Sequence, residues 1–481
     1  MKKLPSSKQS ILPAVLFSDS VLNRLARRSG WLKRASRKTS PRAFINSFLL
    51  TAADGETSFR EVASNIGLYQ DNTVSKQALW ERTGPAAVEF FKQVLERIVS
   101  ESVLPQIPCQ IAGVTRILLH DSSILPLHRS LANVFPASIN QNKKLSAGLR
   151  LQAVFDLANG SALSLVFNGY RERNDQASSG DILPLLKKGD LVLRDLGYLV
   201  GHVLTEIAEK GCFFLSRHIN QRTVFLRETG EKLDLVKYLS IHAPQTGDRA
   251  ECEVTVGSGQ HGAQSIKCRL VARRLPEQGI NQRKREAKRN AKKHSKNGYS
   301  KNHLELLEWE IYLTNLSAEQ ADAETVMATY RLRWRIENLF KALKSNSWGL
   351  KLASHRSNPS HVQVLVLAWL CLVVMAAHTG YFSVVRTGYQ AQDQPEAEES
   401  SSYLSEKKNE AGGVDQQEIS ILKSIRRILK LIGHSLFMSA VESTAEAFVR
   451  MERQIQYHDR YERRQKRINL PENAKKTLGL T

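Results

Sequence analysis

The stretch YRLRWRIENLFKALKS, residues 330–345, sets one carboxylate among several cations, and its apolar spacing predicts a helix. Because an α-helix turns about 100° per residue, four polar side chains would share one narrow arc of its surface: Tyr330, Arg333, Glu337 and Lys344. The neighbouring arc is apolar and is expected to face the core; it carries Leu332, Ile336, Leu339, Phe340 and Leu343. Two interpretations are open: a solvated face on which cations neutralise Glu337, or a surface that binds a ligand.

The composition describes a large, basic and mostly globular chain. It has 481 residues, of which 42% are hydrophobic, and a formal net charge of +22. This charge favours a polyanion partner such as nucleic acid. The longest apolar run, residues 362–377, is slightly short for a membrane span, so we expect a buried core helix and no membrane partner. Five scattered cysteines without a C-x-x-C pair indicate reduced thiols in a cytoplasmic protein.

Residues 1–105 are predicted to form an all-helical DNA-binding domain. Apolar residues recur there at three- and four-residue spacing, and Ser58 with Glu61 forms a capping-box pattern. A second short helix is expected from about Ser75. The pair resembles a helix-turn-helix, with three side chains able to face DNA: Lys76, Gln77 and Arg82. A plain helical bundle is the alternative, because the connecting loop is longer than the usual turn.

Residues 113–380 are predicted to form a mixed α/β domain. The first strand is expected to end at Asp121, the next two form a hairpin around an Asn159-Gly160 turn, and a fourth strand carries Asp195. Helices are predicted before and after this fourth strand, and a further strand follows. This order is that of a ribonuclease-H-like sheet.

The remaining segments are predicted from their composition. Short strands suggest an all-β insertion at about 223–305, and the basic run 283–303 within it is either a solvated or disordered helical segment or a phosphate contact. Ser317 with Gln320 is a second capping-box pattern, expected to open the helix that carries Glu337. We expect a flexible acidic linker at 390–416 and a helical C-terminal region with a basic tail at 417–481.

Three carboxylates stand out by position: Asp121 and Asp195 at strand ends, and Glu337 on a helix after the insertion. Taken singly, each aspartate is better explained as a turn residue that binds local backbone. Taken together, they lie where open α/β sheets form ligand sites. Hard divalent cations prefer oxygen ligands, and two of them about 4 Å apart can hold both oxygens of a phosphoryl transfer. The set therefore predicts a metal-dependent phosphoryl-transfer site.

The polar arc also matches the pattern Y-x(2)-R-x(3)-E-x(6)-K without a departure, from Tyr330 to Lys344. In this pattern, and in the segments HDSSILPLH around Asp121 and LRDLGYL around Asp195, the chain resembles bacterial DDE transposases of the insertion-sequence-four family, which includes the Tn-five transposase. The resemblance covers roughly residues 50 to 380.

This resemblance implies a cut-and-paste DNA transposase with Asp121, Asp195 and Glu337 as catalytic ligands of two Mg²⁺ ions, for which Mn²⁺ can substitute. It implies that Tyr330, Arg333 and Lys344 contact phosphates of the transposon end. It also suggests that Trp309 stacks on a flipped-out base, with a core-packed sheet residue as the alternative.

The implied partners are double-stranded DNA at the transposon ends and target DNA, bound by a homodimer in the synaptic complex. The implied location is the bacterial cytoplasm, with association to the nucleoid when DNA is bound. Two other functions share many of these features. One is a ribonuclease-H-like structure-selective nuclease, and the other is a transposase-derived DNA-binding repressor.

Overall fold

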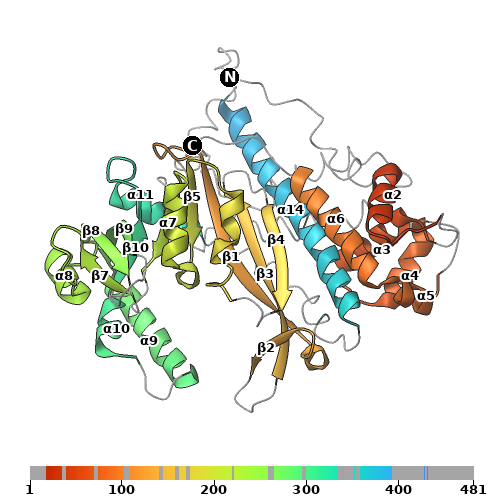
Figure 1. Cartoon of the computed structure of the whole chain (residues 1–481), viewed down its shortest axis with the longest axis horizontal. Helices are drawn as coiled ribbons and strands as arrows, with labels where there is room; N and C mark the ends of the chain where they lie inside the picture. The colour runs from red at the N-terminus through yellow and green to blue at the C-terminus, as the bar shows by residue number, and fades with distance from the viewer. Residues whose placement is uncertain are drawn as a thin grey trace, which may run out of the picture.

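The computed structural model describes most of the chain up to the end of the long helix α14. The described residues are 18–34, 39–69, 74–101, 109–139, 145–157, 162–169, 174–218, 222–257, 265–294, 299–333, 337, 340, 352, 358–392, 427 and 431. Almost all of the expected acidic linker and C-terminal region therefore lies outside them. In Figure 1 the N-terminal helices lie at one side of a large sheet.

The described part of the N-terminal region is helical, as expected. Its helices are α2 (Asp19–Arg28), α3 (Pro41–Ala53), α4 (Phe59–Tyr69), α5 (Lys76–Arg82) and α6 (Pro85–Glu101). Ser40 caps α3 by accepting a hydrogen bond from the backbone N–H of Ala43. Aromatic side chains fill the space between the helices; the Trp31 ring, for example, lies 4.6 Å from that of Phe44. The predicted second short helix begins at Lys76, directly after Ser75.

One mixed sheet joins the strands of the described residues that follow. Its strands are β1 (Arg116–Leu127), β2 (Pro136–Ile139), β3 (Leu145–Asp156), β4 (Ala162–Gly169), β5 (Asp190–Arg194), β6 (Phe213–Arg217), β7 (Thr223–Leu226), β8 (Arg249–Gly257), β9 (Ile266–Arg274) and β10 (Trp309–Thr314). β3 pairs antiparallel with β1 and with β4, whereas β5 is parallel to both β1 and β6. These orders and directions agree with the expected mixed α/β sheet.

Helices cover both faces of this sheet. Because side chains alternate along a strand, Leu119 and Leu193 enter one buried cluster, together with the N-terminal helices and α14 (Pro359–Gln392). Leu118 and Val192 enter a second cluster on the other face, with α7 (Gly201–Glu209). Figure 1 shows α14 and α6 on one side of β1 and β5, and α7 on the other.

The apolar helix α14 is a core element. Its window Pro359–Ala376 is long and apolar enough to cross a membrane, but 83% of that window is buried inside the protein. It packs against α6 and α3. The expectation of a buried core helix over residues 362–377 is therefore supported.

The insertion is not all-β, contrary to the expectation for about 223–305. Strands β7, β8 and β9 extend the main sheet from β10, and three helices accompany them: α8 (Leu235–His242), α9 (Glu277–His294) and α10 (Lys301–Leu306). Much of the basic run lies in α9. There Lys284 pairs with Glu308 at 2.8 Å and Arg283 with Glu310 at 3.1 Å, so part of its charge attaches the helix to the sheet. A sequence that is rich in cations can therefore still form an ordered helix.

The helix predicted over 330–345 is interrupted. α11 spans Ala323–Arg331, and Leu332 and Arg333 form a turn before Glu337, which is again helical. The capping-box contacts between Ser317 and Gln320 form in both directions, but they close a turn. Asp322 is the residue that caps α11, accepting from the N–H of Thr325 at 2.8 Å.

A buried ion pair joins the beginnings of β1 and β5. Arg116 donates to both carboxylate oxygens of Asp190, at 2.8 and 2.5 Å, and the Asp190 side chain is fully buried. We predict that Asp190→Ala lowers the free energy of unfolding by about 3–5 kcal/mol, because it leaves a buried guanidinium unpaired. Chemical denaturation measures this loss.

The matched control is the exposed pair between Arg227 and Glu253, whose side chains are 50% and 51% exposed. Glu253→Ala is expected to change the free energy of unfolding by less than about 1 kcal/mol. Equal losses in the two variants would contradict the structural role given to Asp190.

Candidate active site

The parallel pairing of β1 with β5 brings two aspartates to the same level of the sheet. The last pair in this register is His120 with Arg194, and Asp121 and Asp195 are the next residues on their segments. We expected the first strand to end at Asp121. Instead, β1 continues to Leu127 along β3. Asp121 lies where the pairing with β5 stops.

The third carboxylate reaches this level from the segment after α11. Asp121 projects from the same sheet face as Leu119, and Leu119 shares a buried cluster with Leu332 and Phe340. These two residues flank the turn at Arg333 and the helical residue Glu337. Leu332 and Phe340, from the apolar arc predicted from the sequence, thus pack in the core as expected. This packing places the polar side chains of the segment close to Asp121.

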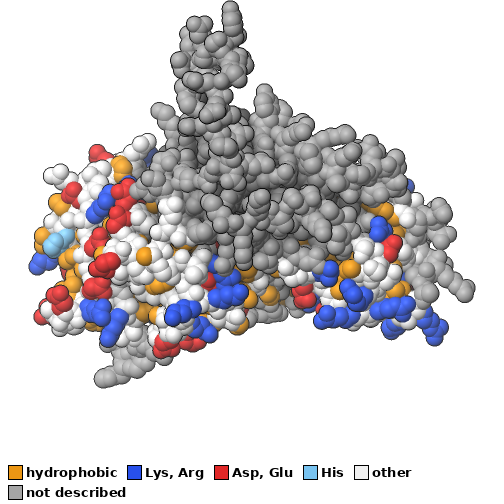
Figure 2. All heavy atoms as spheres, turned by 90° about the horizontal axis from the view of Figure 1, so that it is seen from above, with side chains coloured by type: hydrophobic (Ala, Val, Ile, Leu, Met, Phe, Trp, Pro, Cys, Tyr) orange, Lys and Arg blue, Asp and Glu red, His pale blue; other side chains and the backbone are white. Residues whose placement is uncertain are grey.

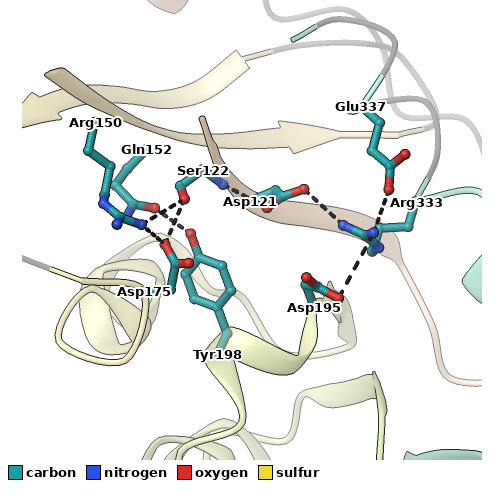
Figure 3. A network of polar contacts seen from close by, with 9 residues as sticks. All are labelled: Asp121, Ser122, Arg150, Gln152, Asp175, Asp195, Tyr198, Arg333 and Glu337. Carbon is teal, nitrogen blue, oxygen red and sulfur yellow. Dashed lines mark hydrogen bonds and ion pairs between the residues drawn. The ribbon is translucent and has the colours of Figure 1, made fainter. Parts of the chain in front are cut away.

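The guanidinium of Arg333 binds all three carboxylates. Its Nη1 donates to Asp121 Oδ2 at 2.9 Å, and its Nη2 lies 2.5 Å from Glu337 Oε1 and 3.9 Å from Asp195 Oδ1. Figure 3 shows the three acidic side chains arranged around this one cation. The predicted convergence of Asp121, Asp195 and Glu337 is therefore present in the structure.

Burial and charge act against each other at this site. The Asp121 side chain is 14% exposed, while those of Asp195 and Glu337 are each 42% exposed. Burial raises the pKa of Asp121 to about 6, although Arg333 and the N–H of Ser122 act in the opposite direction. The other two carboxylates add to the rise. The site therefore holds more negative charge than one buried cation balances.

Arg333 is bound differently from the expected phosphate anchor. Arg333 forms an i,i+4 ion pair with Glu337, which is the contact expected if cations only neutralise that carboxylate. It also forms ion pairs with Asp121 and Asp195. Within the described ranges, no group of three or more acidic, histidine or cysteine side chains is already arranged to hold a metal ion. The guanidinium occupies the space between the carboxylates instead.

Two of the expected DNA contacts lie in the core. Trp309 is 4% exposed and its Nε1 donates to the carbonyl of Ala243 at 3.0 Å, so in this structure the ring packs in the core and stacking on a base stays a prediction. Tyr330 is 6% exposed and its ring lies 4.9 Å from that of Tyr312. A phosphate contact by Tyr330 would require this segment to move. Lys344 lies outside the described residues.

The three predicted DNA contacts on α5 differ in their surroundings. Lys76 and Gln77 are exposed at the start of the helix. Arg82 is half-buried, with its guanidinium 4.3 Å from the centre of the Trp31 ring, and burial lowers its pKa. Lys76 and Gln77 are therefore placed to meet a ligand, whereas Arg82 stabilises the packing of Trp31.

Ser122 contacts the site directly, although we assigned it no role from the sequence. Its backbone N–H donates to Asp121 Oδ1 at 2.7 Å. The only available signal was its position next to Asp121 in the segment HDSS. Any residue type can make a contact through its backbone N–H, so a sequence pattern does not reveal such a contact.

Comparisons with known proteins show the family to which the chain belongs. A family model described as Transposase DDE domain matches residues 112–375, which is more than half of the chain. The transposase for insertion sequence element IS231C of Bacillus thuringiensis subsp. berliner is 26% identical over 348 residues, covering 68% of this chain and 71% of that protein. The transposase for IS1151 of Clostridium perfringens is 24% identical over 373 residues, covering 72% and 74%.

A solved structure, the piggyBac transposase synaptic complex with hairpin DNA, aligns with a TM-score of 0.41 and 10% identity over 95% of this chain and 85% of that one. This likeness is too low to support a conclusion. The chain belongs to the DDE transposase family, in its insertion-sequence-four branch, and it is a transposase. Enzymes of this family use divalent metal ions.

We predict that Arg333→Ala makes the protein more responsive to divalent cations. Without the guanidinium, the three carboxylates repel one another and lose the cation that they share, so the variant should melt at a lower temperature in chelator. Added Mn²⁺ should then raise its melting temperature by more than it raises that of the wild type, because no cation has to be displaced. Thermal unfolding with and without Mn²⁺ measures both effects.

Arg331→Ala is the control, since Arg331 lies 4.0 Å from Glu310 and contacts none of the three carboxylates. Its response to Mn²⁺ should equal that of the wild type. An unchanged response in Arg333→Ala would show that Arg333 does not compete with metal at this site.

Proposed function

We propose that the protein catalyses cut-and-paste transposition of an insertion sequence, cleaving DNA strands at terminal inverted repeats and joining the new 3′ ends to target DNA. The observation that carries this proposal is the convergence of Asp121, Asp195 and Glu337 on one cation. These residues come from three segments of the sequence, with 74 positions between Asp121 and Asp195 and 142 between Asp195 and Glu337. A salt bridge with no further role would need only one of them.

The three carboxylates are the residues proposed to hold the divalent ions. Their oxygen donors suit hard cations, and Mg²⁺ is the ion proposed, with Mn²⁺ as a substitute. When bound, such ions would activate the attacking water or 3′-hydroxyl and stabilise charge on the attacking and leaving oxygens at the scissile phosphate. The protein's own contribution is to hold Asp121 against the N–H of Ser122, and to bring Glu337 to the sheet through the packing of Phe340.

Arg333 is proposed to have two partners in turn. In the structure it binds the carboxylates, and its planar guanidinium is equally suited to a DNA phosphate. Once its three carboxylates are neutralised by other cations, the guanidinium is free to donate to the backbone beside the cut. Tyr330 and Lys344 are proposed to assist at the same phosphates, as in the family pattern.

The N-terminal helices are proposed to bind the transposon end. Five exposed cations lie on α2 and just after it: Arg24, Arg27, Arg28, Lys33 and Arg34. Figure 2 shows Lys and Arg side chains gathered at the right of that view, over the N-terminal helices. Such a cluster suits the phosphate backbone, with Lys76 and Gln77 available for further contacts.

The proposed assembly is a homodimer on two paired DNA ends, because each chain supplies one set of three carboxylates and two ends must be joined. Target DNA is the second nucleic-acid partner. The five-stranded part of the sheet formed by β4, β3, β1, β5 and β6 is proposed to be a ribonuclease-H-like core. The protein would act in the bacterial cytoplasm, on the nucleoid.

Asp195→Asn is predicted to abolish both strand cleavage and strand transfer while leaving affinity for the transposon end nearly unchanged. The amide keeps the size of the carboxylate but loses the charge that attracts metal. Gel assays of cleavage, strand transfer and binding with DNA from the ends of the element measure the three properties.

Asp248→Asn is the control, since Asp248 is an aspartate of the insertion that caps a local turn at Gln245. It should cleave and join DNA like the wild type. Cleavage without any strand transfer by the wild type would favour a structure-selective nuclease, and binding without either reaction would favour a repressor.

A further inference from the structure

A polar cluster lies behind Asp121, on the opposite side of β1 from the three carboxylates. Asp175 Oδ1 accepts hydrogen bonds from Ser122 Oγ at 2.6 Å and from Arg150 Nη1 at 2.5 Å. Arg150 Nη1 also donates to Ser122 Oγ at 3.2 Å. The Arg150 side chain is 8% exposed and that of Asp175 is 33% exposed, so the ion pair is partly shielded from water. Figure 3 shows this cluster beside Asp121.

The cluster is connected to Asp121 through the backbone of Ser122. Neighbouring side chains lie on opposite faces of a strand, so the Ser122 hydroxyl and the Asp121 carboxylate are on opposite faces of β1. The Ser122 hydroxyl donates to Asp175, and the Ser122 backbone N–H donates to Asp121 Oδ1. Fixing the hydroxyl therefore fixes the peptide that carries this N–H. The direction of the Asp121 carboxylate depends in turn on that hydrogen bond, which is 2.7 Å long.

The same cluster is connected to the segment that carries Asp195. A Cβ atom added at Gly197 would lie 3.2 Å from Cβ and Oδ2 of Asp175, so the turn after Asp195 packs directly on the Asp175 side chain. One residue further, Tyr198 donates to Gln152 Oε1 at 2.5 Å. Gln152 is the β3 residue opposite Ser122, so the turn after Asp195 is linked through Tyr198 and Gln152 to the strand position next to Ser122.

We propose that Asp175 and Arg150 are positioning residues, which set the direction of the Asp121 carboxylate through Ser122 and hold the turn after Asp195 beside it. Residues that orient metal-binding side chains in this way commonly affect activity by about 10–100-fold. The inference rests on the proposed function, because it requires Asp121 and Asp195 to be the groups that act on DNA.

A double-mutant cycle on the full-length protein tests the connection. Asp175→Asn, Ser122→Ala and the double variant are compared in single-turnover cleavage of DNA from the ends of the element, at saturating DNA. We expect Asp175→Asn to slow cleavage by about 10–100-fold. The dissociation constant for uncut DNA should stay within about threefold of the wild type, and the concentration of Mn²⁺ needed for half-maximal cleavage should rise.

The double variant should cleave no more slowly than Asp175→Asn alone, because the two substitutions break one connection. Independent, multiplying losses would overturn the proposal, and so would a wild-type rate and Mn²⁺ dependence in Asp175→Asn. If Asp175→Asn does not fold, Ser122→Ala decides alone: it removes one hydroxyl and must slow cleavage without weakening DNA binding.

Glu308→Gln is the matched control, since Glu308 is a partly buried carboxylate paired with Arg274 at 2.6 Å, away from the site. It should cleave at the wild-type rate, and an equal loss there would reveal a general effect of removing ion pairs. Asp121→Asn separates the two claims. If it still cleaves, the proposed function fails; if it is inactive while Asp175→Asn is fully active, only the positioning role fails.

Discussion

The parallel pairing of β1 with β5 is the constraint on which the candidate site depends. It places Asp121 and Asp195, 74 positions apart in the sequence, one step beyond the same pair of residues. The buried ion pair between Arg116 and Asp190 fixes this register at the other end of the two strands. A slip of one residue would turn Asp121 to the opposite face of the sheet and would also break that ion pair.

The three carboxylates that are brought together in this way require a cation nearby, and in the structure this cation is the guanidinium of Arg333. One guanidinium faces three carboxylates, of which Asp121 is largely buried, so the arrangement is short of positive charge. That shortage is the physical reason why the site should attract divalent ions when DNA brings further negative charge. The polar cluster around Asp175 lies on the other face, where it can support the strand without occupying the site.

Much of this could be predicted from the sequence, because alternating and helical apolar patterns report burial directly. The mixed sheet, the buried helix α14 and the convergence of the three carboxylates follow from such patterns and from the family motif. The interruption of the helix at Leu332 and Arg333 could not be predicted, since no Pro or Gly marks it. A helical segment was one open interpretation of the basic run that forms α9. The helices α8 and α10 were missed because the short strands around them dominated the pattern.

The burial of Trp309 and Tyr330 shows a further limit of sequence patterns. Trp309 fits a motif position for DNA contact and a core position equally well, whereas Tyr330 was expected on the polar arc, and the structure buries both. The contact from Ser122 to Asp121 is made by backbone atoms, which every residue type has. Positioning groups of this kind become visible only when distances are known.

The central claim is that Asp121, Asp195 and Glu337 form one cation site, in which Arg333 gives way to metal when DNA is bound. Anomalous diffraction from crystals of the protein with Mn²⁺ and DNA from its own element tests this most directly. We expect a manganese peak in contact with the carboxylates of Asp121 and Asp195, and Arg333 turned toward a DNA phosphate. A structure in which Arg333 keeps all three carboxylates and the manganese lies elsewhere would contradict it.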